Sequence, residues 1–211
     1  MDYRLTSYDS FNFMSLYNSK IHISNLIDRR VRVTTKRGEH YGKICVKNKG
    51  YYKLFVNAYN SKCAYCGINT DIIPTTLFEI DHFINKTQMI LPTGNSVNNV
   101  ENLVFSCRGC NQAKHDYDTS EVYDLLHPDH ESVTSIFVRG ATYGISVSEE
   151  YQSNPVIVNF YKKLHLDSSF RKLDYLLMNL KAMSRLEAAD DLNHLILRLY
   201  ADLLEMRNRV I

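Results

Sequence analysis

The sequence predicts an α+β fold in which short strands and helices are joined by loops and followed by longer helices. Residues 31–46, "VRVTTKRGEHYGKICV", alternate around Gly38 and are rich in β-branched residues, which is typical of a β-hairpin. Residues 134–147, "TSIFVRGATYGISV", predict a second hairpin that turns near Gly140. From Ser168 onward the apolar residues recur at helical spacing.

The composition is that of an ordinary globular chain. Of its 211 residues, 45% are hydrophobic and 23% are charged, which excludes wholesale disorder and allows one good core with appendages. The sequence has no apolar run near the roughly 18 residues that a membrane span needs, so we expect no membrane association. The N-terminus, "MDYRLTSYDSFNF", is polar and aromatic, unlike a secretory signal, and the expected location is the cytoplasm.

The small net charge of +2 hides an asymmetry between the two halves of the chain. Residues 1–116 contain 15 Lys and Arg against 9 Asp and Glu, whereas residues 117–211 contain 10 against 14. A basic half suits a polyanion such as nucleic acid, and an acidic, leucine-rich half suits protein contacts.

The regions outside the C-terminal helices differ in how clearly they predict structure. Residues 1–28 allow a helix or a short strand, residues 51–60 predict a short helix, residues 71–98 are loop-like, and residues 111–127 have helical character. The N-terminal hairpin with its approach is basic, and two interpretations remain open for it, a solvated surface and an arm that contacts phosphates. Its basic residues are Arg29, Arg30, Arg32, Lys36, Arg37 and Lys43.

The C-terminal segment predicts two helices that break near "RLEAADD", residues 185–191. Each helix carries one apolar stripe. The stripes are Leu173, Leu176, Leu177 and Leu180, and then Leu192, Leu195, Ile196, Leu199 and Leu203. Such stripes pack into a core or form a surface for a second copy or another protein, and both alternatives stay open.

Four of the five cysteines form two Cys-x-x-Cys pairs, Cys63 with Cys66 and Cys107 with Cys110. In a reducing compartment this pattern favours a metal site over disulfides. Four thiolates close a tetrahedral Zn²⁺ site and leave no position for a substrate, so the predicted zinc is structural. The remaining Cys45 is interpreted as an ordinary thiol.

Between the two cysteine pairs lies "EIDHF", in which Asp81 and His82 are adjacent. A neutral imidazole is well suited to take a proton from water near pH 7. A carboxylate beside it can hold Mg²⁺, a hard cation that prefers oxygen ligands. A base and a cation together are what the hydrolysis of a phosphodiester requires.

The motifs "CAYCG", "EIDHF" and "ENLVFSCRGCNQAK", taken in this order, resemble the HNH endonuclease family over residues 52–116. The resemblance implies a ββα-metal core braced by a four-cysteine zinc. It implies that His82 is the general base, that Asp81 is a ligand of the catalytic metal, and that Asn102 fixes the loop and orients His82. Asn111 takes the final motif position, where an amide oxygen favours Mg²⁺ or Mn²⁺.

Two basic residues, Arg108 and Lys114, flank the second cysteine pair, and we expect them to contact phosphates, with solvated surface charge as the alternative. His115 is a reserve candidate for the site. The sequence "DHFINK" lacks the proline that usually follows the Asp-His pair in the family, so the loop that leads to Asn102 is expected to take its own course.

These observations divide the chain into a basic N-terminal extension (1–50), a nuclease core (51–117), an extension of that core (118–167) and a helical region (168–211). The resemblance implies a metal-dependent endonuclease that hydrolyses DNA and leaves 5′-phosphate and 3′-hydroxyl ends. Its expected setting is restriction or antiviral defence, and its C-terminal helices would contact a second copy or an ATPase partner, as in Septu-like systems. The alternatives are a zinc-stabilised nucleic-acid-binding or regulatory module without catalysis, and an RNA nuclease.

Overall fold

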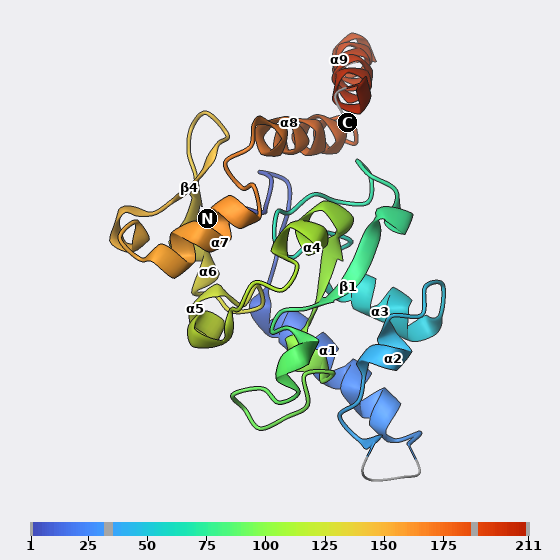
Figure 1. Cartoon of the computed structure of the whole chain (residues 1–211). Coiled ribbons are helices and arrows are strands. Elements are labelled where there is room, and N and C mark those ends of the chain that lie inside the picture. The colour runs from blue at the N-terminus through green and yellow to red at the C-terminus, as the bar shows by residue number, and fades with distance from the viewer. Residues whose placement is uncertain (1, 32–35, 187–189, 210–211) are drawn as a thin grey trace.

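The computed structural model describes residues 2–31, 36–186 and 190–209 (Figure 1). Its N-terminal part is helical. Helix α1 (Phe13–Asp28) begins at Asn12, whose Oδ1 accepts a hydrogen bond from the backbone N–H of Ser15 at 2.9 Å and so caps the helix. The buried face of α1 packs against α3 (Gly50–Ala58), which resolves the ambiguity of residues 1–28 in favour of a helix and confirms the helix expected near residues 51–60.

The centre of the molecule is a two-stranded antiparallel hairpin followed at once by a helix. Strand β1 (Phe78–His82) pairs with β2 (Leu103–Cys107). Helix α4 (Arg108–Lys114) starts at the next residue and packs against both strands. This is the predicted ββα arrangement, and it confirms the α+β fold class.

Aromatic side chains fill the core beneath this hairpin. Phe78 of β1 and Phe105 of β2 stack with ring centroids 4.7 Å apart, and Tyr59 lies next to them just after α3. Burying such rings is the main source of stability in a core of this size. The position of Asp81 and His82 is therefore fixed by the packing of the strand that carries them.

The second predicted hairpin and the two C-terminal helices are also confirmed. Strands β3 (Phe137–Arg139) and β4 (Ile145–Val147) pair across a turn that contains Gly140. Helix α8 (Ser169–Met183) and helix α9 (Asp190–Arg209) are separated where the sequence predicted a break. The remaining α-helices are α2 (Tyr41–Ile44), α5 (Tyr123–Leu126), α6 (Val133–Ile136) and α7 (Pro155–Lys163). Short 3₁₀ helices are η2 (Thr75–Leu77), η3 (Lys86–Gln88), η4 (Val100–Asn102), η5 (Ser120–Val122) and η6 (Glu149–Tyr151).

The prediction of an N-terminal basic hairpin is wrong for the residues that the structure describes. Residues 32–35 lie outside the described residues, but residues 41–44, where the returning strand was expected, form helix α2. The backbone N–H groups of His40 and Tyr41 donate to the carbonyl oxygen of Asn98. Because His40 and Ile44, four residues apart, are both buried, tertiary packing imposes a helical period on a segment whose alternation favoured a strand.

One hydrophobic cluster continues through most of the chain, from Tyr3 to Met178. The segments that the sequence separates at residues 50, 117 and 167 therefore share a core, and those boundaries stay a prediction. Within the described ranges, every helix is too short or too polar to cross a bilayer.

Candidate active site and zinc centre

The four paired cysteines converge. Cys63 and Cys66 lie in the turn after α3, Cys107 ends β2, and Cys110 lies in α4. Their sulfur atoms all lie within 4.8 Å of one another, and all four side chains are buried. The Sγ atoms of Cys66 and Cys107 are 3.8 Å apart, close to the roughly 3.8 Å edge of a tetrahedron with zinc–sulfur bonds of about 2.3 Å. The cluster therefore fits Zn²⁺ in a closed site of four thiolates.

The tight turn at the first cysteine pair depends on a glycine. Gly67 has φ +79°, and a Cβ there would lie 2.4 Å from the carbonyl oxygen of Arg4. Its N–H donates to the carbonyl oxygen of Cys63 at 2.9 Å, which closes the loop. The turn thus aims both sulfur atoms inward while the N-terminal segment packs over it.

A partly buried arginine from α8, Arg171, completes the surroundings of the cluster. Arg171 Nη2 lies 3.3 Å from the sulfur of Cys110. Burial disfavours its charge, but the negative charge of the cysteine thiolates outweighs that effect and raises the pKa of Arg171. Asp174 continues this series of side-chain contacts: it lies 3.8 Å from Arg171 and accepts a hydrogen bond from Arg207 of α9 at 2.6 Å. The cysteine cluster is thereby connected to both C-terminal helices.

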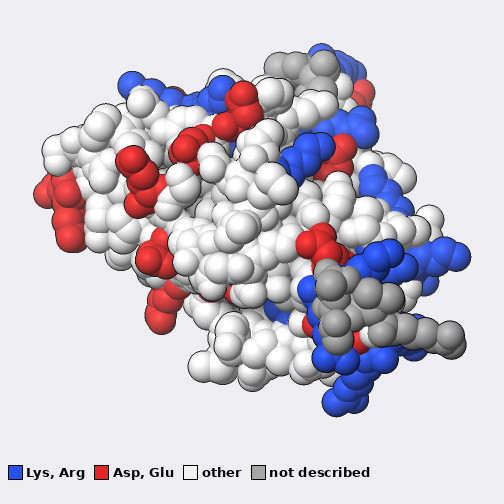
Figure 2. Space-filling model, turned by 60° about the horizontal axis from the view of Figure 1, so that its bottom comes forward, with Lys and Arg blue, Asp and Glu red and all other residues white. Residues whose placement is uncertain are grey.

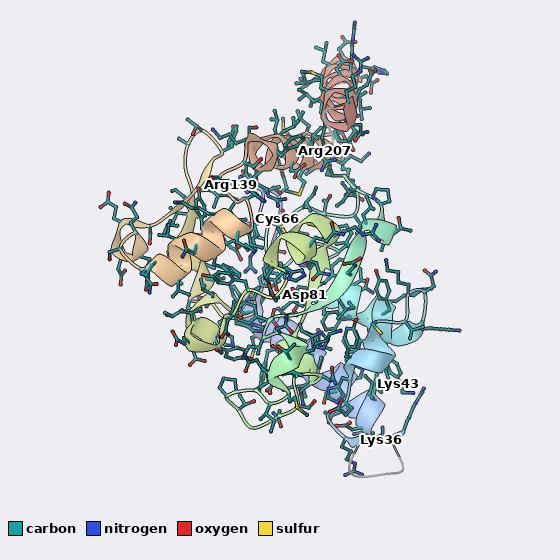
Figure 3. All side chains as sticks on the ribbon, viewed as in Figure 1. Lys36, Lys43, Cys66, Asp81, Arg139 and Arg207 are labelled. Atoms are coloured by element: carbon teal, nitrogen blue, oxygen red, sulfur yellow. The ribbon has the colours of Figure 1, made fainter. Side chains whose placement is uncertain are left out.

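Three of the predicted site residues, Asp81, His82 and Asn111, line one cleft of about 160 Å³, and Asn102 does not line it. Asp81 and His82 stand at the end of β1, and Asn111 comes from α4, which starts where β2 ends. Figure 3 shows Asp81 beside α4, further from α8 than Cys66 is. The lining consists of Tyr41, Ile80, Asp81, His82, Asn85, Lys86, Asn111 and His115.

Among the described residues, only one of the two ring nitrogens of His82 has a hydrogen-bond partner. Its Nε2 lies 2.9 Å from Asn98 Oδ1, and the Asn98 amide in turn donates to Glu39 at 2.8 Å. Because Oδ1 can only accept, Nε2 carries the proton and Nδ1 keeps a free lone pair; no described residue donates a hydrogen bond to Nδ1. Tyr41 packs on the ring with centroids 4.3 Å apart. Burial lowers the pKa of His82, so the ring is neutral near pH 7.

Asp81 is more buried than its proposed role requires. The hydroxyl of Tyr65 donates to its Oδ2 at 2.6 Å, and Lys114 Nζ lies 3.3 Å from the same oxygen. Burial raises the pKa of Asp81, and Lys114 and Tyr65 oppose that rise. A carboxylate has room for about four hydrogen-bond partners or ligands, so it can still accept a cation from the cleft.

Asn111 is oriented by a residue that the motif comparison did not single out. Its Nδ2 donates to Glu79 Oε2 at 2.5 Å, and Glu79 also accepts from Arg108 at 3.2 Å. With its donor occupied, the amide offers its oxygen as the remaining polar atom. That oxygen, together with the carboxylate of Asp81, is a donor set of the type that Mg²⁺ and Mn²⁺ prefer.

Asn102 fixes the loop but does not contact His82 with its side chain. It is fully buried; its Oδ1 accepts from Ile84 N at 2.8 Å, and its Nδ2 donates to the carbonyls of Ile84 and Val97 at 2.9 Å each. These bonds tie the two ends of the loop between the strands together. The orienting contact expected of Asn102 is made by Asn98 instead.

The two expected phosphate contacts have different outcomes. Arg108 is exposed beside the cleft, whereas only 1% of Lys114 is exposed. The amine of Lys114 points inward, where it donates to the backbone oxygen of His82 at 2.9 Å and pairs with Asp81. The structure thus differs from the expectation for Lys114, whose charge stabilises the site from inside and cannot reach a nucleic acid.

Sequence reasoning missed the residues that come from the N-terminal extension. Tyr41 packs on His82 and Glu39 accepts from Asn98, both from a segment that was predicted as a hairpin, and Asn98 lies in a loop rich in asparagine. The signal that could have found Asn98 is its place in "SVNNVEN", four residues before Asn102. Nothing in the sequence connects it to Glu39.

Comparison with known proteins agrees with this geometry. Residues 63–117 match the family model of the HNH endonuclease. The matched segment contains both cysteine pairs, the hairpin and α4. No curated protein and no solved structure matches the chain. Residues 63–117 therefore match an HNH endonuclease domain, and this match suggests nuclease activity on nucleic acid.

Proposed function

We propose that this protein is a divalent-metal-dependent endonuclease that hydrolyses phosphodiester bonds of DNA. The observation that carries the proposal is one cleft lined by His82, Asp81 and Asn111, where the bond between Nε2 of His82 and Asn98 leaves Nδ1 unprotonated. A base and a cation-binding oxygen pair on one small surface are the groups that phosphodiester hydrolysis needs.

His82 would take a proton from the attacking water at Nδ1. The hydrogen bond from Nε2–H to Asn98 fixes the tautomer that leaves Nδ1 free, and Glu39 holds Asn98 in turn. As the ring becomes positively charged, the carbonyl oxygen of Asn98 stabilises it. Tyr41 restricts the rotation of the ring.

Asp81 and Asn111 would hold Mg²⁺ or Mn²⁺. When bound, the cation offsets the negative charge that develops on the phosphate and the leaving oxygen. Lys114 and Tyr65 position the carboxylate of Asp81, and Glu79 positions the amide of Asn111. The zinc of the four cysteines is a separate, structural ion with no open position.

A basic surface beside the cleft supports nucleic acid as the substrate. Figure 2 shows Lys and Arg gathered mainly on one side of the molecule and Asp and Glu mainly on the other. From Tyr41, which lines the cleft, the exposed basic residues extend over the end of α1 and the start of α3. They are Arg29, Arg30, Lys36, Arg37, Lys43, Lys47, Lys49 and Lys53, and we propose that they contact the phosphates of DNA.

The biological setting is part of the same proposal. Small proteins with the layout that this sequence resembles occur in restriction and in defence against phages. We therefore propose a cytoplasmic role in such a system, in which foreign DNA is the substrate.

The test is plasmid cleavage by purified protein with Mg²⁺, Mn²⁺ or EDTA, comparing the wild type with His82→Ala. The matched control is His22→Ala, which removes an exposed histidine from α1, away from the cleft. Loss of a general base lowers the rate by about 10²- to 10⁴-fold, and we expect that loss for His82→Ala alone, with DNA affinity and zinc content unchanged.

Three results would contradict parts of the proposal. Cleavage that persists in His82→Ala excludes His82 as the base. A zinc-loaded wild type that binds DNA without cutting it is a binding module. Cleavage of RNA in preference to DNA of the same sequence moves the substrate to RNA.

A further inference from the structure

Helix α9 has two apolar faces, and the fold covers one of them. Ile196 and Arg207 are buried, and Tyr200, Leu203 and Leu204 are partly buried against the core and α8. These residues account for the packing of α9 within the chain. In Figure 1 the helix lies at the edge of the molecule, beyond α8 and away from the central hairpin.

The second apolar face is open to solvent among the described residues. Leu192 is 52% exposed, Leu195 64%, Leu199 48% and Met206 60%. Their spacing of three, four and seven residues keeps them on one face of the helix and is the repeat by which paired helices interlock. Large apolar residues that line up in this way mark an interaction surface, whereas scattered ones do not.

The charges beside this face identify the partner. Along its edge the exposed charged residues are Asp191, Arg198, Asp202, Glu205 and Arg209, and their signs alternate apart from Glu205, which pairs with Arg209 within the chain. A two-fold axis crossing the helix near Tyr200 would place Asp191 next to Arg209 of a second copy, and Arg198 next to Asp202 of that copy. Parallel pairing in register would instead turn this edge towards the opposite edge of the second helix, so that these charges would form none of these pairs.

Two further features favour the antiparallel arrangement. The first turn of α9 is acidic and the last turn is basic, so opposed helices also bring together ends of opposite charge and opposite dipole. Arg209 pairs within the chain with Glu205, but both side chains are mostly exposed. Such a surface pair contributes little and can be exchanged for a contact with the second copy.

We infer that the protein forms a homodimer through antiparallel pairing of α9, with Leu192, Leu195, Leu199 and Met206 at the interface. In this arrangement Leu199 meets its own counterpart near the axis, and Leu192 lies close to Met206 of the second copy. The inference does not depend on catalysis. Its consequence for the proposed function is that one particle carries two clefts, one for each strand of a duplex.

The deciding experiment is directional cross-linking of the full-length protein. In a Cys45→Ser background, which removes the one cysteine outside the zinc cluster, Leu192→Cys and Met206→Cys are made as separate chains, one of them carrying a size tag. Under mild oxidation the mixture should give a disulfide between the two different chains, while each variant alone and the parent background stay uncross-linked. Cross-linking of each variant with itself, or none in the mixture, overturns the antiparallel dimer.

Light scattering coupled to gel filtration checks the state without cross-links. Leu195→Glu should halve the molar mass, whereas the matched control Leu197→Glu, at an exposed position off the apolar face, should leave the dimer intact. Arg198→Asp alone and Asp202→Arg alone should each weaken the dimer, and the double variant should restore it, because the pair is exchanged across the axis. A wild type that stays monomeric at every concentration, as a chain built to bind only a different protein would, overturns the inference.

Discussion

The four-cysteine cluster and the His82 cleft lie on the same ββα unit, yet their side chains are held in different ways. Among the described residues, the thiols contact one another and Arg171. In the cleft, each functional side chain has its own protein partner: Tyr65 and Lys114 hold Asp81, Asn98 holds His82, and Glu79 holds Asn111.

This difference defines what each ion does. Four buried thiolates repel one another, so their arrangement needs a cation to be stable, and the free energy of metal binding becomes free energy of folding. The cleft is assembled by hydrogen bonds and ion pairs that exist without a metal. The ion that we propose for the cleft would therefore be required for the reaction and dispensable for the fold.

The largest effect that tests this contrast is expected at the cluster. Cys66→Ser, or zinc removal by a strong chelator, should cost on the order of 10 kcal/mol of folding free energy and unfold the domain. Circular dichroism with a zinc assay measures the loss, and Cys45→Ser is the control because Cys45 lies outside the cluster. A Cys66→Ser protein that stays folded without zinc would remove the distinction between the two sites.

Asn102, which holds the loop between the strands, tests whether the stability of the fold and the chemistry of the cleft can be separated. Asn102→Ala breaks three side-chain hydrogen bonds and leaves buried groups of Ile84 and Val97 without partners, at about 3 kcal/mol. Chemical denaturation should show this loss, while His82→Ala should keep nearly full stability. The control is Asn99→Ala, which removes one bond of a half-buried residue. Equal stability of Asn102→Ala and wild type would mean that the loop is not held by this side chain.

The sequence was informative where function depends on short motifs whose residue types and internal spacing indicate their chemistry. The two Cys-x-x-Cys pairs predicted the cluster, because a tetrahedral thiolate site follows from ligand type and spacing. Asp81, His82 and Asn111 were predicted to share a site, and they line one cleft because the hairpin and α4 are consecutive elements.

Where contacts join distant segments, the sequence did not predict them. Glu39 and Asn98 are 59 residues apart, and no local pattern indicates that α2 packs on the loop. Lys114 looked like a surface charge because lysine is rarely buried, and its burial depends on the carboxylate of Asp81, a partner 33 residues away. The alternation in residues 31–46 favoured strands, but the contacts that stabilise α2 come from elsewhere in the chain and could not be read from that pattern.

Asn98 gives a smaller and more specific effect on the cleft. Asn98→Ala removes the acceptor that fixes the His82 tautomer, so we expect cleavage to fall about 30-fold, equal to about 2 kcal/mol, with the melting temperature nearly unchanged. Single-turnover cleavage measures the rate, and Asn95→Ala on the same loop is the control. Asn98→Asp should retain more activity than Asn98→Ala because it keeps an acceptor. A uniform effect on binding, with the rate of the chemical step intact, would argue against a positioning role.

The smallest effect is expected at Arg171, which belongs to α8 yet offsets the negative charge of the cysteine cluster. A hydrogen bond to a charged group contributes about 1.5 kcal/mol, so Arg171→Gln should release zinc to a chromogenic chelator roughly tenfold faster while the protein stays folded. Lys172→Gln, which changes an exposed neighbour on the same helix, should release zinc at the wild-type rate.

The same variant tests the contacts between the two C-terminal helices. Because Arg171 contacts Asp174, which accepts from Arg207 of α9, the Arg171→Gln protein should also be cut more readily by a protease between α8 and α9. Faster cutting without faster zinc release would show that Arg171 supports the helices alone, and the charge of the cluster would then have to be balanced by the ion and the protein backbone.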